Sequence, residues 1–401
     1  MSPRKPSSAS SKSRIEPPTD VGLYLHFPFC VRKCPYCDFA SEPLDEAGGP
    51  PAARRYLDAL AIELDLRAAT DEFRGASVTT LYLGGGTPTV LPPEWLAEII
   101  ARIEQRFALS PEAEITVEAN PGTVDEQKTA DLLAAGVNRV SLGVQSFSDA
   151  VLRALGRIHN AAEAEAAVQA ARAAGCANLN LDLIYGVPNQ SLEEWRETLQ
   201  QALDLRPEHI ATYALSVEPG TPLAADIETG RLPAPDDDLS ADMYAAAGEL
   251  LCGAGYSHYE ISNFARPGRE SQHNRRYWAN AEYLGLGASA HSYRGGLRWN
   301  NLPSQSVYTE WLERGRLPVA RAEALSQRQR LGETLMLGLR RAEGVCEEEV
   351  ANLCGIAPRE AFSEEIDRLC SQGLLIAAAG DLRVPREKWF ISNEVLAQFV
   401  P

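Results

Sequence analysis

From residue 21 onward, short runs of β-branched and aliphatic residues alternate with longer segments in which apolar residues recur at helical spacing. This alternation is typical of a parallel sheet covered by helices. Six runs are predicted to be strands: 22–27, 78–83, 115–119, 139–144, 179–184 and 209–215. The helical segments between them include 54–69, 93–107, 125–135, 162–174 and 191–205, and several end at a glycine, as a helix C-cap would.

Six β/α units are fewer than the eight of a closed barrel, so the pattern predicts an α/β fold built on a partial (β/α)6, TIM-like barrel. In such barrels the chemistry gathers at the C-terminal ends of the strands. Polar residues follow several of the predicted strands at this end. Each one alone could be a turn residue or a hydrogen-bonded core residue, but their shared placement favours a functional site. The segments at that end are Gly84-Gly85-Gly86-Thr87-Pro88, Glu118-Ala119-Asn120-Pro121, Gln145-Ser146-Phe147 and Tyr185-Gly186-Val187-Pro188.

The chain outside the barrel divides into three regions. Residues 1–19 are rich in Ser, Pro, Lys and Arg and predict a disordered tail; an organelle transit peptide would need an amphipathic apolar face that they lack. We expect the barrel to span 20–235 and a central region to span 236–320. Short helices followed by strand-like runs predict a small winged-helix-like α+β domain over 321–401, and because it has no basic face we expect a structural or lid role.

Composition narrows the function classes. Of the 401 residues, 45% are apolar and 23% charged, as in ordinary globular proteins, and no run is long and apolar enough to predict a transmembrane segment. The net charge of -17 opposes general nucleic-acid binding. Eight cysteines are too dilute for a disulfide framework, and five of them are scattered, which favours a reducing compartment and a cytoplasmic location.

The other three cysteines, Cys30, Cys34 and Cys37, follow the first predicted strand with C-x-x-x-C-x-x-C spacing. A zinc site usually needs four ligands, and the nearest candidate for the fourth, His26, lies within a strand pattern that favours a packed core histidine. Thiolates also hold iron–sulfur clusters, usually through four protein ligands. Three cysteines would leave one iron open, which suits a small chelating molecule with an amino group and a carboxylate.

This loop resembles that of the radical S-adenosylmethionine (SAM) superfamily, in which SAM occupies the fourth coordination site of a [4Fe-4S] cluster. Over most of its length the chain is similar to the oxygen-independent coproporphyrinogen III oxidase family of that superfamily. A glycine turn would let the backbone approach the methionine group, and an arginine could hold its carboxylate as a fork. The resemblance implies SAM contacts at Tyr24, Gly85, Gly86, Thr87, Glu118, Gln145, Arg157 and Asp182.

Three features favour the heme chaperone branch of this family, known as HemW. The decarboxylating enzymes carry a further cysteine two residues after the third, and here that place is Phe39. The strings His273-Asn274-Arg275-Arg276-Tyr277-Trp278 and Tyr283-Leu284-Gly285-Leu286-Gly287-Ala288-Ser289-Ala290-His291-Ser292 are similar to that branch. The resemblance implies a carrier, not an enzyme, that delivers heme to acceptor proteins such as respiratory cytochromes, and a homodimer is a further implication. The alternative is oxidative decarboxylation of coproporphyrinogen III to protoporphyrinogen IX.

Residues 266–298 provide independent support for a heme ligand. They contain six arginines and two acidic residues, a local balance of +4 in an acidic chain, interleaved with aromatic residues. Aromatic faces and guanidinium forks suit a flat tetrapyrrole with two propionates. Both histidines could instead form structural hydrogen bonds, and the arginines could pair with surface acids. The candidate heme-binding residues are His273, Tyr277, Trp278 and His291.

Overall fold

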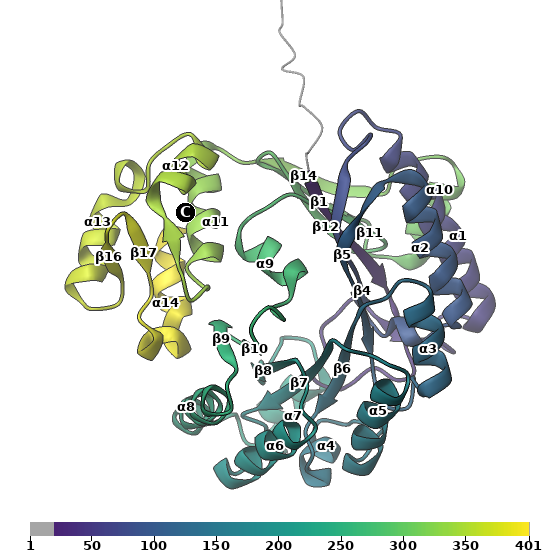
Figure 1. Cartoon of the computed structure of the whole chain (residues 1–401), viewed down its shortest axis with the longest axis horizontal. Helices are drawn as coiled ribbons and strands as arrows, with labels where there is room; N and C mark the ends of the chain where they lie inside the picture. The colour runs from purple at the N-terminus through teal and green to yellow at the C-terminus, as the bar shows by residue number, and fades with distance from the viewer. Residues whose placement is uncertain (1–19, 401) are drawn as a thin grey trace, which may run out of the picture.

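The computed structural model describes residues 20–400 (Figure 1). The tail predicted for residues 1–19 lies outside the described residues. All six predicted strands are present, and they run parallel and pair in chain order. They are β1 (Asp20–Phe27), β4 (Ser77–Gly85), β5 (Ala108–Ala119), β6 (Arg139–Gln145), β7 (Leu179–Tyr185) and β8 (His209–Ala214).

The predicted helices are also present and lie along the outer side of the parallel strands (Figure 1). Local sequence fixes where some begin: the Asn160 side chain accepts from the backbone of Glu163 at 2.9 Å, and Glu163 accepts in return from the backbone of Asn160 at 2.8 Å. This capping box satisfies two donors that the first turn would leave unpaired. The helices are α1 (Gly49–Ala68), α2 (Pro93–Arg106), α3 (Glu126–Ala134), α4 (Asp149–Ala154), α5 (Ala161–Ala173) and α6 (Leu192–Asp204).

Alternation along the strands separates a core from a polar interior. Leu81 and Leu83 of β4 are fully buried in one apolar core with Trp195 of α6. Each such side chain contributes about 1.5–3 kcal/mol by leaving water. Tyr82 lies between the two leucines and therefore points to the opposite face of the sheet, as does Glu118 relative to Val117 on β5. The polar residues predicted to form a site consequently project into the barrel.

The sheet is wider than the sequence predicts. At the β1 edge, β11 pairs with β1 in parallel, and three antiparallel strands follow it; at the β8 edge, β10 and β9 add two more, so the sheet has twelve strands. Together they form a partial, open barrel. The added strands are β9 (Ser257–Glu260), β10 (Asn263–Ala265), β11 (Tyr283–Leu286), β12 (His291–Arg294), β13 (Leu297–Asn301) and β14 (Val319–Ala324).

Helix α9 (Gln272–Trp278) contains the His-Asn-x-x-Tyr-Trp string and is held inside the barrel by hydrogen bonds. The Glu114 carboxylate on β5 accepts hydrogen bonds from the backbone N–H groups of Gln272 and His273, both at 3.1 Å. A carboxylate at this end satisfies N–H groups that have no partner within the helix. The helices that connect the outer strands are α7 (Pro222–Glu228), α8 (Asp237–Gly253) and α10 (Gln305–Glu313). Three short elements lie near the cysteines: β2 (Phe29–Cys30), β3 (Glu42–Pro43) and η1 (Pro88–Val90).

The last part of the chain forms a small winged-helix-like domain with its own apolar core, which includes Leu331, Trp389 and Phe399. Its three-stranded sheet has the order β15-β17-β16. Among residues 20–400, no helix is both long enough and apolar enough to cross a membrane. The elements are α11 (Gln327–Gly338), β15 (Val345–Cys346), α12 (Glu347–Cys354), α13 (Pro358–Ser371), β16 (Ile376–Ala378), β17 (Asp381–Arg383), η2 (Arg386–Ile391), α14 (Ser392–Leu396) and η3 (Ala397–Phe399).

Candidate functional site

The cysteine loop leaves the C-terminal end of β1 and is fixed by backbone hydrogen bonds. The Gly86 N–H donates to the Phe27 carbonyl at 2.8 Å, and the Thr87 N–H donates to the Phe29 carbonyl at 2.7 Å. At the loop's far end, the Leu44 N–H donates to the Cys30 carbonyl at 2.8 Å. The glycine turn after β4 therefore determines where the first cysteine lies.

Packing requires glycine in this turn. A Cβ on Gly86 would lie 2.6 Å from the Phe29 carbonyl oxygen, and Gly85 has a φ of 108° with a Cβ position 2.4 Å from the His26 ring. A side chain at either position would push the turn away from β1 and the loop. The triple glycine thus allows two strand ends to approach closely, whatever ligand they hold.

A cavity of about 380 Å³ opens beside the loop. All three cysteines line it, as do seven of the eight residues to which the sequence assigns SAM contacts. Asn120, which the sequence placed in a polar segment at this end of the strands, also lines it, as do residues that we did not predict, including Tyr82 and Ser141. Tyr82 could have been found, because strand alternation places it on the same face as the residues that follow the strand. The predicted residues in the cavity are Gly85, Gly86, Thr87, Glu118, Gln145, Arg157 and Asp182.

Tyr24 is the predicted residue that does not line this cavity. Its ring packs against Tyr82 with centroids 6.2 Å apart, and its hydroxyl lies 3.0 Å from Nδ1 of His26. Tyr24 instead lines a second cavity, described below. Its assigned contact with SAM therefore remains a prediction, and its ring lies at the wall between the two cavities.

Two half-buried carboxyl groups face the first cavity. Glu118 accepts from the Tyr82 hydroxyl at 2.8 Å and from the Gly85 N–H at 2.9 Å, and burial raises its pKa to about 7. Asp182 accepts from the Ser141 hydroxyl at 3.1 Å, and burial raises its pKa as well. Both groups therefore favour a cationic or hydrogen-bond-donating ligand, which would stabilise their ionised forms.

Arg157 contacts the cysteine loop as well as residues at the ends of the strands. It donates to the Gly143 carbonyl at 3.0 Å, to Asn120, and to the Cys34 sulfur at 3.3 Å. Its Nε is buried without a partner within residues 20–400. The guanidinium can therefore contact Cys34 and still offer a donor to a ligand in the cavity.

The thiols are suited to a ligand that neutralises them. Burial raises the pKa of Cys30 and of Cys37, so neither is a thiolate at neutral pH without a positive partner. Iron would supply that charge. Across residues 20–400, no three His, Cys, Asp or Glu side chains are gathered closely enough to hold a single metal ion.

A second cavity, of about 510 Å³, lies between the barrel edge, α9, β11–β12 and α11. Three of the four candidate heme-binding residues line it: Tyr277, Trp278 and His291. Its wall includes four tyrosines and one tryptophan. Within the described chain the His291 ring has no hydrogen-bond partner, and the indole Nε1 of Trp278 is buried without one. The cavity therefore offers an imidazole and a flat apolar wall to a ligand.

His273 does not line the second cavity. It is 1% exposed, with Nδ1 2.8 Å from the Thr80 hydroxyl and Nε2 2.9 Å from the Tyr277 hydroxyl. Burial lowers its pKa to about 3, so the ring is neutral. Binding iron would require His273 to give up one of these hydrogen bonds, whereas His291 has none to lose.

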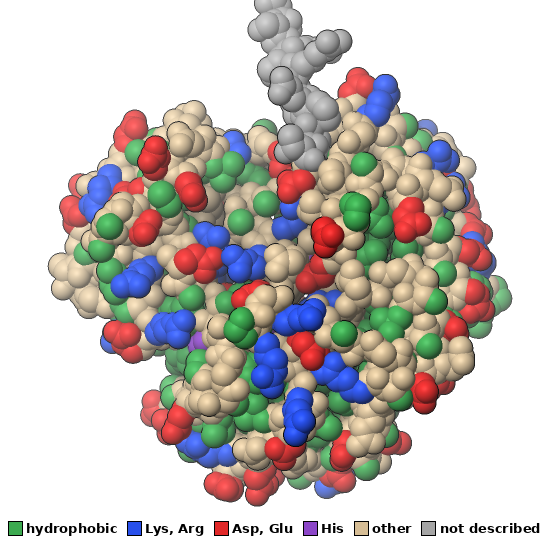
Figure 2. Space-filling view, viewed as in Figure 1, with side chains coloured by type: hydrophobic (Ala, Val, Ile, Leu, Met, Phe, Trp, Pro, Cys, Tyr) green, Lys and Arg blue, Asp and Glu red, His purple; other side chains and the backbone are tan. Residues whose placement is uncertain are grey.

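Several arginines of the basic segment 266–298 form ion pairs with acidic residues. Arg276 reaches Asp20 at 3.1 Å, and Arg298 reaches Glu323 at 2.9 Å. Figure 2 shows Lys and Arg interspersed with Asp and Glu over the face in view. Of the six arginines, Arg298 is the one that lines the second cavity. The local positive charge is therefore largely compensated, and one guanidinium remains in reach of a ligand there.

Comparison with known proteins agrees with this fold. Residues 24–202 match the Radical SAM superfamily model, and residues 325–391 match the HemN C-terminal domain model. The solved structure of coproporphyrinogen III oxidase (HemN) from Escherichia coli superposes with a TM-score of 0.84 and 25% identity, covering 96% of this chain and 91% of that one. That protein is a radical SAM enzyme. The partial barrel and cysteine loop thus define a radical SAM protein, a class that implies SAM and a [4Fe-4S] cluster.

Curated relatives specify the family further. "Heme chaperone HemW" of Mycobacterium tuberculosis (strain ATCC 25618 / H37Rv) is 40% identical and covers 82% of this chain and 84% of its own. The Lactococcus lactis protein of the same name is 35% identical over 94% of this chain and 96% of its own. The chain belongs to the HemW family.

The raised pKa of the Glu118 carboxyl predicts a pH dependence of stability. Because its pKa is raised in the folded protein, the unfolded chain loses this proton first, and stability falls as pH rises from about 4.5 toward about 7. Glu118→Gln removes this contribution, so urea unfolding between pH 5 and 7 should show a shallower fall than in the wild type. The exposed Glu126→Gln should keep the wild-type slope, and an unchanged slope in Glu118→Gln would contradict the assignment.

Proposed function

We propose that this protein is a heme carrier, which binds heme and a SAM-coordinated [4Fe-4S] cluster and transfers heme to acceptor proteins. The observation that carries the proposal is the coexistence of two cavities: a thiol-lined polar one and an aromatic one with a free imidazole. Membership of the family whose relatives are called heme chaperones supports it. Cytochromes of the respiratory chain are the acceptors that we favour, with the protein acting in the cytoplasm.

In this proposal Cys30, Cys34 and Cys37 bind three irons of the cluster, and the bound cluster with SAM supplies one-electron chemistry. The residues around it hold SAM in place. Arg157 would bind the carboxylate of SAM through a fork, and Glu118 would accept from its ribose hydroxyls or ammonium. Gly85, Gly86 and Thr87 would present the backbone and a hydroxyl, while Gln145 and Asp182 would complete the polar wall.

Gln145 has a further property that suits a binding role. Its φ is 68°, in the left-handed region that glycine favours and other residues rarely adopt. Such strain persists where the surroundings require it and clusters at binding sites. It lies at the end of β6, so the strained backbone turns its side chain toward the cavity that it lines.

Heme would occupy the second cavity. A flat ring could lie against Tyr277 and Trp278, and His291 would bind the iron through its free imidazole. The remaining candidate, His273, would support this wall by holding the Tyr277 hydroxyl. A homodimer, which the family resemblance implies, would have to form without covering this cavity if heme is to leave.

The alternative function is coproporphyrinogen III oxidation. It is favoured by the resemblance in fold to HemN, a radical SAM enzyme. Phe39 opposes it, because this side chain stands where the decarboxylating enzymes have a cysteine. Phe39 lines the first cavity and is 59% exposed. A phenyl ring therefore lies where that chemistry would need a thiol.

One anaerobic experiment separates the two functions. With the cluster reconstituted and SAM and a reductant supplied, coproporphyrinogen consumption and hemin binding are followed in parallel. We expect stoichiometric hemin binding, seen in the Soret band, with no protoporphyrinogen formed. Efficient turnover of coproporphyrinogen would establish the enzyme instead, and failure to bind hemin would contradict the carrier.

The cluster assignment predicts that Cys34→Ala loses the bound iron after reconstitution while the fold is retained. Two thiolates cannot hold the cluster at its usual affinity, and the loop lies at the barrel mouth, outside the main core. Iron per chain and the circular dichroism spectrum provide the measurement. Cys252→Ala, at an exposed and scattered cysteine, is the matched control. Full iron content in Cys34→Ala would refute the assignment.

The heme assignment predicts that His291→Ala shifts the Soret band and weakens hemin binding by about tenfold or more, because the iron loses an axial ligand. Iron content from the cluster should be unchanged. His273→Ala should instead lower the melting temperature, since two buried hydrogen bonds are lost at about 1 kcal/mol each. An unchanged hemin spectrum in His291→Ala would exclude His291 as the ligand.

A further inference from the structure

The C-terminal domain forms part of the second cavity's wall. Glu333 and Leu337 of α11 line the cavity together with Tyr24 and His26 of β1. The other faces of these two elements belong to separate apolar cores: Leu23 and Leu25 of β1 lie in the core of the barrel, and Leu331 and Leu335 of α11 lie in the core of the C-terminal domain. The position of the small domain therefore sets the size of the cavity.

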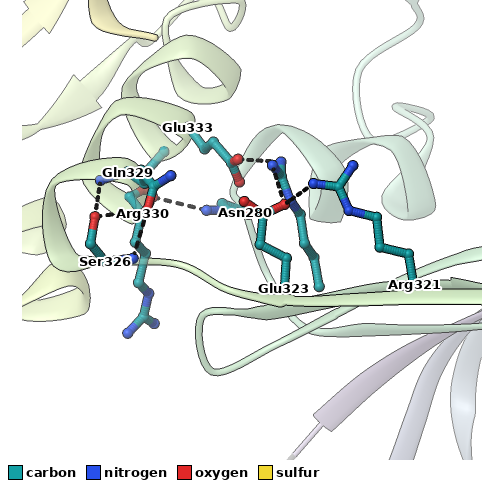
Figure 3. A network of polar contacts seen from close by, with 9 residues as sticks. Asn280, Arg321, Glu323, Ser326, Gln329, Arg330 and Glu333 are labelled. Atoms are coloured by element: carbon teal, nitrogen blue, oxygen red, sulfur yellow. Dashed lines mark hydrogen bonds and ion pairs between the residues drawn. The ribbon is translucent and has the colours of Figure 1, made fainter. Parts of the chain in front are cut away.

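An ion-pair network joins the two parts at the cavity (Figure 3). Arg298 of β13 donates through Nη1 to Glu333, and through Nε and Nη2 to Glu323 at 3.1 and 2.9 Å. Glu323 also pairs with Arg321 at 3.3 Å. Among the residues that the structure describes, Arg298 is the one ion-pair partner of Glu333. Glu333 is thus held to the barrel side through a single guanidinium nitrogen.

The other contacts on this side are mainly polar, and Arg340 also lies over the Trp278 ring, 5.6 Å from its centroid. Asn280 donates to the Thr334 hydroxyl at 2.9 Å, and Arg330 donates to the Tyr293 hydroxyl at 3.1 Å. The first bond is buried and the second is half-buried, so opening this side would expose both to water. Because water then replaces part of each lost hydrogen bond, this side opens more readily than an apolar contact would.

The far side of the interface, near β9, is aromatic. His258 packs edge-on against Trp389 with centroids 4.6 Å apart, and Tyr244 packs against Phe390 at 5.7 Å. The Ala342 N–H donates to the Tyr259 carbonyl at 2.9 Å. A domain with its own core, apolar contacts at one edge and polar contacts at the other is suited to rotate about the apolar edge.

We propose that Arg298 recognises a carboxylate of the ligand in the second cavity, and that this carboxylate replaces Glu333 on Arg298 and so releases α11. The inference rests on the proposed function, which supplies a tetrapyrrole with two propionates. The step is an exchange of ion-pair partners and changes no covalent bond. Ligand binding would thereby open the wall through which heme leaves.

The charges around Arg298 favour this exchange. Arg298 already contacts two carboxylates, so an entering propionate would place a third negative charge on one guanidinium. Glu323 keeps Arg321 as a second partner, whereas Glu333 has none, so Glu333 is the group to be displaced. Burial also raises the pKa of Glu333, which means that its ionised form is held less well there than in water.

The test compares hemin with hemin dimethyl ester, which keeps the ring and iron but has no carboxylates. Wild-type protein should bind hemin about tenfold more tightly than the ester, because a charge-assisted fork is formed only with hemin. Arg298→Ala should bind both equally. Arg321→Ala, which removes a guanidinium that pairs with Glu323 outside the cavity, should keep the wild-type preference. An undiminished preference for hemin in Arg298→Ala would overturn the proposal.

Glu333→Gln tests the exchange itself. It keeps the side-chain shape and removes the competing charge, so hemin affinity should rise about threefold to tenfold while ester affinity stays constant. Reduced or unchanged hemin affinity would overturn the exchange. Small-angle scattering supplies a second readout: the wild-type radius of gyration should increase with hemin and not with the ester, and ligand-free Glu333→Gln should already be expanded. No expansion in either case would also overturn it.

These outcomes distinguish the inference from the proposed function. If wild-type protein bound neither hemin nor its ester, the carrier function would fail, and with it the ligand exchange. If hemin bound stoichiometrically with no preference over the ester, the carrier would stand and the role of Arg298 would fall.

Discussion

Strand β1 is held on both edges, and the rest of the structure depends on this. It pairs in parallel with β4 on one side and with β11 on the other, so the strand that leads into the cysteines is an internal strand of the sheet. Tyr24 and His26 project from it toward the second cavity, while the loop that follows it lines the first. His26 also bonds through Nε2 to the Ala40 carbonyl at 2.8 Å, just beyond the cysteines. One strand thus fixes both sites relative to each other.

The two cavities share a wall of aromatic rings. Tyr82 faces the first cavity and packs against Tyr24, which faces the second; on its other side Tyr82 stacks on His273 at 5.1 Å. His273 in turn contacts Tyr277 at 4.8 Å. The wall therefore depends on the position of α9. Glu114 binds the N-terminus of this helix, and the rings of His273 and Tyr277 complete the wall. In the proposed function, this wall would separate the radical SAM site from the neighbouring heme site.

The sequence predicts the parts of the fold that periodicity reveals. The parallel strands are long apolar runs between amphipathic helices, and all six were found. Seven of the eight residues assigned to SAM line one cavity, and their contacts with SAM stay a prediction. The outer strands were missed because β11–β13 are four or five residues long, and β11 joins β1 from more than 250 positions away. Side-chain roles were harder still. Residue type gave Tyr24 and His273 as candidates, but their orientation depends on Tyr82 and Thr80, which only tertiary packing brings beside them.

The central claim is that cluster and heme occupy separate sites in one chain. Anomalous scattering at the iron edge, from crystals of protein loaded with both, tests it most directly. We expect two iron positions, one within bonding distance of Cys30, Cys34 and Cys37 and the other in the second cavity beside His291. Heme iron found at the cysteines, or no iron in the second cavity of protein that binds hemin stoichiometrically in solution, would contradict it.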